Sequence, residues 1–197
     1  MNYILNSKYN SYGIIQYDDN KSTDYRLFLE GTLLNSEEIK LEYYIDKEGM
    51  TKDKLSKHLI LESSGPLLVH QKIKDVLEKE THFTQFFPTE FSIGKEIVKD
   101  YYALNIILKT KCFDMEKSEF KLTNFDPKYP TYRFYYIVLK ENALDEDVEI
   151  SLSEEISRYI VINDRIKKAL TEKKVSGIKF NKSIDLTPND RSEFTEI

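Results

Sequence analysis

Two stretches of the chain share one pattern, in which a short apolar run is followed by an amphipathic helix and a second apolar run. The clearer copy is YIVINDRIKKALTEKKVSGIKF at residues 159–180, and a weaker copy is LLVHQKIKDVLEKETHFTQFF at residues 67–87. Apolar residues recur three and four positions apart, which places their side chains on one helix face. A helix of about three turns is marginal alone, so each requires a sheet to cover its apolar face.

The residues of each unit have distinct expected roles. The apolar stripes are Ile73, Val76 and Leu77 in the first copy and Ile166, Ala169 and Leu170 in the second. Asn163 or Asp164 can cap the second helix by accepting a hydrogen bond from a first-turn N–H. Gly177 follows the last periodic residues and can end the helix or form the next turn. We expect the stripe residues Ile73, Leu77, Ile166 and Leu170 to be buried against a sheet.

Most other apolar runs are typical of strands. They are YGIIQY, YRLFLEGTLL and KLEYYIDKEG within the first 50 residues, HLILESSGPLLVH around a Ser-Ser-Gly-Pro turn, YYALNIILK at 101–109 and YRFYYIVLK at 132–140. The last two are apolar enough to be central strands. A polar connector separates them, with turns expected at Asp126-Pro127 and Tyr129-Pro130. We expect the end of the chain, LTPNDRSEFTEI, to be poorly ordered at its tip.

The layout predicts an α+β fold, a mixed and largely antiparallel sheet with a few short amphipathic helices packed on it. Composition limits the function of such a domain. The net charge is −5 over 197 residues, which disfavours a nucleic-acid binder because phosphates require a basic face. Cys112 is the single cysteine, consistent with a reducing compartment. With no signal peptide and no apolar run of roughly 18 residues, we expect a cytoplasmic protein without a membrane partner.

No pattern predicts a catalytic, cofactor-binding or metal-binding residue. His58, His70 and His82 are 12 positions apart, and on a helix that spacing turns them by about 120° from one another. No Cys or carboxylate stands at metal-ligand spacing from two of them. We expect Cys112 to be a buried small side chain rather than a reactive thiolate. The usual nucleophile, phosphate-loop and zinc motifs are missing as well.

Two charged clusters also have ordinary interpretations. The carboxylates near Ser118 could act as acids or bases only if a pocket brought them together, so we interpret them as a solvated connector with local caps; they are Asp114, Glu116 and Glu119. We interpret the basic face of the second helix as its solvent side rather than a phosphate site, since no aromatic stacking motif accompanies it. Its residues are Arg165, Lys167, Lys168, Lys173 and Lys174.

Several segments occur in a recognisable order. They are GPLLVHQKIKDVLE (65–78), YYALNIILKTKCFDMEKSEF (101–120), YYIVLKENAL (135–144) and the 159–180 unit. Together they resemble the helix, the Tyr-x-x-Leu-Asn strand with its connector, the next strand and the closing helix of the Immunity protein 11 family of bacterial polymorphic-toxin systems. His70 and Asn163 stand where that family often has a serine cap. The resemblance covers residues 58–182, and the first 50 residues carry no recognised motif.

The resemblance implies a non-enzymatic immunity protein that binds and neutralises one cognate toxin, with no cofactor and no catalytic residue to carry over. It divides the chain into a strand-rich N-terminal part of the same domain at 1–57, the immunity-protein-like region at 58–182 and a C-terminal tail at 183–197. Two alternatives stay open, namely an enzyme of unrecognised type acting on a toxin product and a small-ligand binding module. The oligomeric state also stays open.

Charge suggests where a toxin could bind. Between Lys140 and Arg158 the chain carries seven carboxylates and no Lys or Arg, so this segment of −7 exceeds the whole-chain −5 and the remainder nets +2. It is either a solvated loop that aids solubility or a surface for a basic toxin, where complementary charge speeds encounter. The toxin-binding residues expected on the second interpretation are Glu141, Asp145, Glu146, Asp147 and Glu149.

Overall fold

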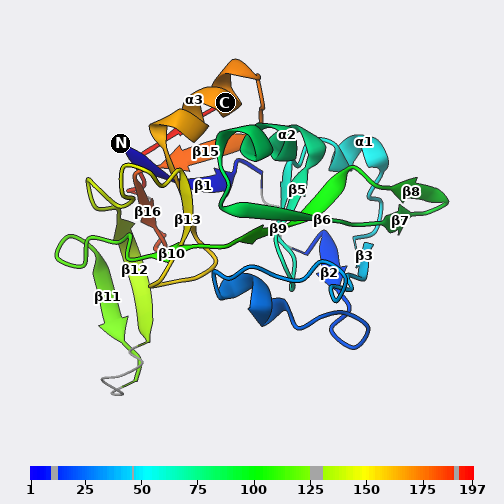
Figure 1. Ribbon diagram of the computed structural model, residues 1–197, viewed down its shortest axis with the longest axis horizontal. Coiled ribbons are helices and arrows are strands. Elements are labelled where there is room, and N and C mark those ends of the chain that lie inside the picture. The colour runs from blue at the N-terminus through cyan, green and yellow to red at the C-terminus, as the bar shows by residue number, and fades with distance from the viewer. Residues whose placement is uncertain (10–12, 46, 125–130, 189–190) are drawn as a thin grey trace.

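A computed structural model describes residues 1–9, 13–45, 47–124, 131–188 and 191–197 of the chain. The expected turns at Asp126-Pro127 and Tyr129-Pro130 lie outside these residues. Within them the fold is mostly strand with few helices, and the pairing is mixed but largely antiparallel, as an α+β class requires (Figure 1). The strands form several separate sheets rather than the single sheet expected. No helix in the described ranges is both long and apolar enough to cross a membrane.

The largest sheet has six strands in the order β10-β13-β14-β1-β15-β17. Their bounds are Lys109–Thr110 for β10, Ile150–Ser153 for β13, Ile160–Asn163 for β14, Asn2–Ser7 for β1, Ile178–Asn181 for β15 and Phe194–Glu196 for β17. β1 lies between β14 and β15 and pairs antiparallel with both. The described parallel pair in this sheet is β10 with β13. The expected strand after Gly177 is confirmed as β15.

A second sheet has the order β4-β5-β9-β6. Its strands are Ile60–Leu61 for β4, Leu68–His70 for β5, Tyr101–Ile106 for β9 and Thr84–Pro88 for β6. β4 and β5 pair antiparallel around the predicted Ser-Ser-Gly-Pro turn. β9 lies between β5 and β6, which confirms that the 101–109 run contains a central strand.

The two predicted helices are α2, Gln71–Glu80, and α3, Asp164–Glu172. They lie side by side on one face of the molecule, where they cover both sheets (Figure 1). Their four expected core residues are fully buried, which confirms the stripes: Ile73, Leu77, Ile166 and Leu170. A short helix, α1 (Lys52–Leu55), precedes β4.

Capping side chains and left-handed residues explain where the helices begin and end. The Asn163 side chain accepts a hydrogen bond from the Ile166 N–H at 3.1 Å, as predicted for a cap. His70 takes the same position on α2, where its Nδ1 accepts from the Lys72 N–H at 3.1 Å. The left-handed residue that follows α3 is Lys174, at φ +51°, while Gly177 at φ +81° forms the turn into β15. Gly177 therefore serves the turn rather than the helix end.

The N-terminal part is only partly strand. β2 (Ile15–Tyr17) and β3 (Tyr43–Ile45) pair antiparallel as expected. YRLFLEGTLL was predicted to be a strand, and this was wrong, because Tyr25–Leu29 forms a 3₁₀ helix, η1. The Asp24 side chain accepts from the Arg26 N–H and caps this turn, while Phe28 is buried beneath it. β7 (Phe91–Ile93) and β8 (Glu96–Val98) form a separate hairpin.

A third sheet has the order β11-β12-β16, with bounds Glu119–Leu122, Tyr132–Val138 and Ser183–Asp185. β12 is the predicted 132–140 strand, but it belongs to this smaller sheet. The polar connector before it was expected to lack a strand and instead contains β11. The C-terminal tip was expected to be poorly ordered, and instead it carries β17 paired with β15. Every residue of β11 and β17 is exposed, so neither strand shows the alternation of buried and exposed residues by which a strand is predicted.

Three clusters of buried side chains organise these elements. The first lies between the two larger sheets and beneath α2 and α3. The second lies between the four-stranded sheet and residues 14–50, and includes Phe28 and Tyr101. The third lies on the other face of β1 and β14, against β12 and the segments around Phe113 and Leu144. The acidic segment begins at the edge of this third cluster.

Candidate functional site

The first part of the acidic segment, residues 141–149, connects β12 to β13, and its inner side chains are anchored in the core. Ala143 and Leu144 are buried in the third cluster. The Val148 N–H donates to the Asp145 carbonyl at 3.0 Å and closes a turn. Glu146 and Asp147 therefore occupy the two central positions of that turn. A loop anchored in this way presents its outward side chains in a defined place.

Residues 145–147, which we name the acidic turn, present three adjacent carboxylates to solvent. Asp145, Glu146 and Asp147 are all exposed. Within the part of the chain that the structure describes, none of the three carboxylates has a hydrogen-bond or ion-pair partner. Like charges on adjacent residues repel one another, and no ion pair with a described cation offsets the repulsion. The acidic turn is thus a concentrated and unneutralised patch of negative charge.

Other carboxylates of the same segment are used inside the molecule. Glu149 lies 3.4 Å from Arg165, which also pairs with Glu80 at 2.9 Å. Glu155 accepts hydrogen bonds from the backbone N–H groups of Cys112 at 3.2 Å and Phe113 at 3.0 Å. These contacts join the segment to α3 and to the third cluster. Among the predicted toxin-binding residues, Glu149 therefore differs from the acidic turn because it already has a partner.

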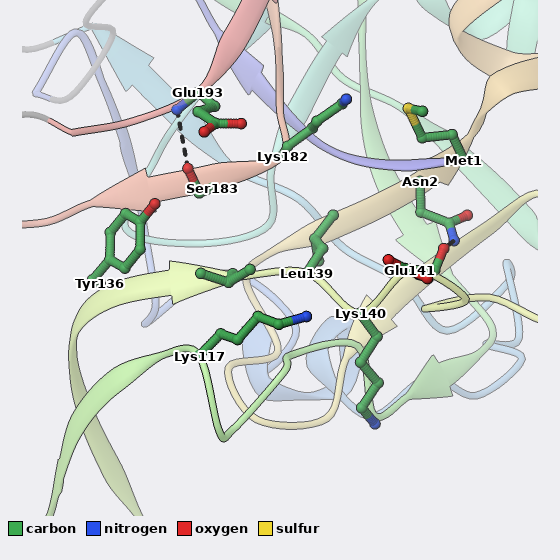
Figure 2. Close-up of a pocket in the computed structure, with 11 residues that line it drawn as sticks. Met1, Asn2, Lys117, Tyr136, Leu139, Lys140, Glu141, Lys182, Ser183 and Glu193 are labelled. Carbon is green, nitrogen blue, oxygen red and sulfur yellow. Dashed lines mark hydrogen bonds between the residues drawn. The ribbon is translucent and has the colours of Figure 1, made fainter.

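Glu141 lines a hollow of about 560 Å³ beside the acidic segment. Figure 2 shows Lys117 and Tyr136 on one side of this hollow and Met1, Asn2 and Glu141 on the other. The Asn2 amide donates to the Glu141 carbonyl at 3.2 Å, which fixes the rim to β1. The hollow and the acidic turn thus belong to one end of the molecule.

The cations around this hollow are engaged to different degrees. Lys117 pairs with Asp114 at 3.0 Å, and the Lys140 amine donates to the Lys111 carbonyl at 2.7 Å. Lys182 has no side-chain partner among the described residues. Charges of both signs therefore border the hollow, which suits recognition of another charged surface. Among the residues that line the hollow, only Glu141 was predicted from sequence to bind a toxin.

Strand pairing explains why sequence reasoning missed these residues. Val138 pairs with Ser183 across β12 and β16, which brings Lys182 and Glu193 to the hollow. No local spacing in the chain records this pairing. The available signal was the alternation in YRFYYIV, which indicates that one face of this strand needs a covering partner.

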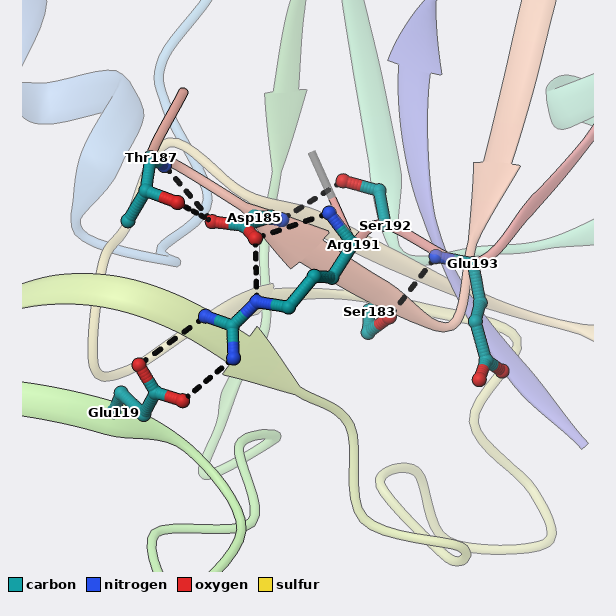
Figure 3. Close-up of polar contacts among 7 residues, drawn as sticks. All are labelled: Glu119, Ser183, Asp185, Thr187, Arg191, Ser192 and Glu193. Carbon is teal, nitrogen blue, oxygen red and sulfur yellow. Dashed lines mark hydrogen bonds and ion pairs between the residues drawn. The ribbon is translucent and has the colours of Figure 1, made fainter. Parts of the chain in front are cut away.

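A buried carboxylate fixes the segment that follows β16 (Figure 3). Asp185 accepts hydrogen bonds from the Thr187 hydroxyl at 2.6 Å and from Arg191 Nε at 2.7 Å. Arg191 also contacts both carboxylate oxygens of Glu119, at 2.9 and 3.2 Å, and its guanidinium lies 4.6 Å from the Tyr136 ring centre. Thr187 and Arg191 hold the pKa of Asp185 well below its usual range. Glu119, expected in a solvated cluster, thus ties β11 to the C-terminal segment.

A second hollow, of about 490 Å³, lies where the two larger sheets meet. Apolar side chains of both sheets, such as Leu5 and Leu104, line it together with the loops that carry Ser63 and Arg158. Small-molecule sites are commonly apolar with a few polar groups. The small-ligand alternative would place its ligand here.

Cys112 and the histidines, which the sequence analysis considered as reactive or metal-binding groups, do not form a shared metal site among the described residues. Cys112 is buried as expected, and burial raises the pKa of its thiol to about 12. Burial lowers the pKa of His58 and of His70, and the latter serves as a helix cap. In the ranges that the structure describes, no three His, Cys, Asp or Glu side chains form a group that could hold a metal ion.

The basic face of α3 is only partly a solvent face. Arg165 is committed to Glu80 and Glu149. The Lys167 amine lies 4.0 Å from the centre of the Tyr3 ring, a distance typical of a cation–π contact. These two residues have internal partners, in keeping with a structural rather than a phosphate-binding role.

The class of the protein follows from comparison with known families. Residues 16–185 match the model of an immunity protein family. That family is Imm11, and the chain belongs to it because the match covers most of its 197 residues. No curated protein matches the chain. The resemblance noted in the sequence is confirmed and extended, because the match begins before β3 and η1 rather than at residue 58. An immunity family points to a toxin partner in general.

Proposed function

We propose that this chain neutralises one cognate bacterial toxin of a polymorphic-toxin system by binding it in the cytoplasm without turnover. Membership of the Imm11 family supports the role. The acidic turn is the observation that supports a place for the contact, since its three carboxylates lack partners within the described chain. A basic surface on the toxin supplies the missing counter-charge.

The proposed contact extends to both sides of the acidic turn. Glu141 lies on the rim of the first hollow. Glu149 adds negative potential next to the turn, although Arg165 neutralises part of it. Charges of one sign gathered on a fixed loop attract an oppositely charged partner over a distance of about one Debye length. Association should therefore be fast at low salt and slower at high salt.

The test neutralises the acidic turn without changing its shape. Asp145, Glu146 and Asp147 are changed together to Asn, Gln and Asn, and association is measured with an inactivated toxin-domain protein encoded by the neighbouring gene. We expect the on-rate at low salt to fall roughly tenfold and its salt dependence to flatten. The unfolding midpoint should not fall, because these side chains have no partners to lose and their mutual repulsion is removed.

A matched control separates local charge from total charge. Asp19, Glu37 and Glu48 are exposed carboxylates of the N-terminal part, and their change to Asn, Gln and Gln alters the net charge equally. This variant should keep nearly the wild-type on-rate and salt dependence. Equal effects of the two triple variants would contradict a localised contact. If far less than one equivalent of this protein neutralised the toxin, the protein would have to turn over, which would favour the enzyme alternative.

A further inference from the structure

Strand β11 is an open edge of its sheet. It pairs with β12 on one side, and no other described strand lies on its other side. All four of its residues, Glu119–Leu122, are exposed. The backbone N–H and C=O groups on the free side of such a strand can pair with another extended chain. Most proteins cover or protect an edge of this kind.

One face of this edge is apolar. Phe120 and Leu122 are 37% and 36% exposed, and they pair with Phe134 and Tyr132 of β12. The Phe120 ring makes an edge-to-face contact with Tyr132 at 5.2 Å and a tilted contact with Phe134 at 5.4 Å. Phe134 is itself buried in the third cluster. An apolar surface therefore continues from the core onto an uncovered strand.

The opposite face carries two cations that no described carboxylate neutralises. Lys121 and Arg133 are directly paired across β11 and β12, so like charges oppose each other in one sheet position. Arg133 lies 5.8 Å from the Tyr135 ring centre, and neither side chain has an ion-pair partner among the described residues. Glu119, the nearest acid along the strand, is held by Arg191. A carboxylate placed beside Lys121 would relieve this repulsion.

We propose that an extended segment of the cognate toxin adds to β11 as a further strand, with apolar side chains beside Phe120 and Leu122 and a carboxylate beside Lys121. The inference rests on the proposed function and defines the partner's chemistry. Backbone pairing supplies affinity in this mode, and the alternating side chains supply specificity. Figure 1 shows β11 and the β12–β13 loop at the same end of the molecule, so one partner can contact both.

A second copy of the chain is a poorer occupant of this edge. The antiparallel register that places Phe120 beside Leu122 of another copy also places Lys121 beside Lys121. The register that places Phe120 beside Phe120 sets Lys121 beside Glu119, whose carboxylate Arg191 already binds. Opposed like charges across strands are unfavourable. Self-association through β11 is therefore an outcome that the test must detect.

The experiment uses the inactivated toxin-domain protein encoded by the neighbouring gene. Leu122→Thr removes the apolar contact but keeps a good strand former, and Lys121→Glu reverses the charge. Each should weaken the complex by roughly tenfold in Kd, the scale of a well-packed interface residue. The matched control is Ile97→Thr, at a 51% exposed residue of the β7–β8 hairpin, which should bind like wild type. Binding should also slow exchange of the Phe120 and Leu122 amide hydrogens.

The outcomes separate this inference from the function on which it rests. If wild-type protein forms no complex, both proposals fail. If it forms a complex that the acidic-turn variant weakens, while both β11 variants bind like wild type, only the strand-addition proposal fails. Protection of the β11 amides in the protein alone at high concentration, with dimers in sedimentation, would assign the edge to a second copy and overturn the proposal.

Discussion

At the scale of single residues, Asp185 is a charge that the surrounding structure holds firmly in place. Its side chain is fully buried, yet it stays ionised because Thr187 and Arg191 supply hydrogen bonds to it. Hydrogen bonds to the charged form lower the pKa of a carboxyl group. No sequence pattern indicates this role, since an acid between Ile184 and Leu186 looks like any polar residue at a strand end.

The low pKa of Asp185 has a defined consequence for stability. A carboxyl group whose pKa is lower in the folded than in the unfolded state stabilises the fold above the unfolded pKa, which is about 4, and loses this effect as pH falls. We therefore expect Asp185→Asn to be clearly less stable than wild type at pH 7, with a gap that narrows below about pH 4. Urea unfolding across this range measures the gap. A gap for Asp185→Asn that is independent of pH would refute the ionised state.

At the scale of elements, the helices and strands that could be predicted from sequence were those with a clear repeat of apolar residues. Both helices could be predicted because Ile73 and Leu77 repeat at helical spacing in one and Ile166 and Leu170 in the other. β11 could not be predicted, because all of its residues are exposed and its order comes from pairing with β12. The same limit applies to the site. The run of carboxylates identified the acidic segment. However, the groups that bind Glu149 and Glu155, namely Arg165 and the backbone of Cys112 and Phe113, are distant in sequence.

The cap of α3 gives a test at this scale. Changing Asn163 to Ala removes the acceptor for the Ile166 N–H, and we expect the free energy of unfolding to fall by about 1 kcal/mol. Asn163→Ser keeps a capping oxygen and should lose clearly less. Urea midpoints of the two variants, interpreted with a common slope, provide the comparison. Equal losses would indicate that the contact of the Asn163 amide with the Val148 carbonyl matters more than the cap.

At the scale of the whole molecule, shared strands connect the three buried clusters. β1 directs Leu5 into the first cluster and Ile4 into the third. β9 directs Leu104 into the first and Tyr101 into the second. A strand with both faces buried cannot separate from one cluster without disturbing the other. We therefore propose that residues 1–57 unfold together with the rest, while their assignment to the same domain stays a prediction.

Two core substitutions test this cooperativity. Leu170→Ala in the first cluster and Phe28→Ala in the second should each cost on the order of 2–5 kcal/mol, because each leaves a cavity. Both should lower the same single calorimetric transition, by roughly 2–4 °C for each kcal/mol. Leu33→Ala, at a 72% exposed side chain, should leave the transition in place. Two transitions, with Phe28→Ala moving just one, would show that the N-terminal part is a separate domain.

The central position of β1 also sets the order of events during synthesis. Its neighbours in the sheet, β14 and β15, are translated long after it, and Ile4 pairs with Val161 on one side and Asn181 on the other. While the ribosome is adding the residues between them, both edges of β1 stay unpaired and its apolar side chains stay exposed. Such non-local pairing slows folding and leaves an aggregation-prone nascent chain. A cell that makes this protein gains a folded molecule only after β15 has emerged, so the delay between translation and a usable protein is built into its topology.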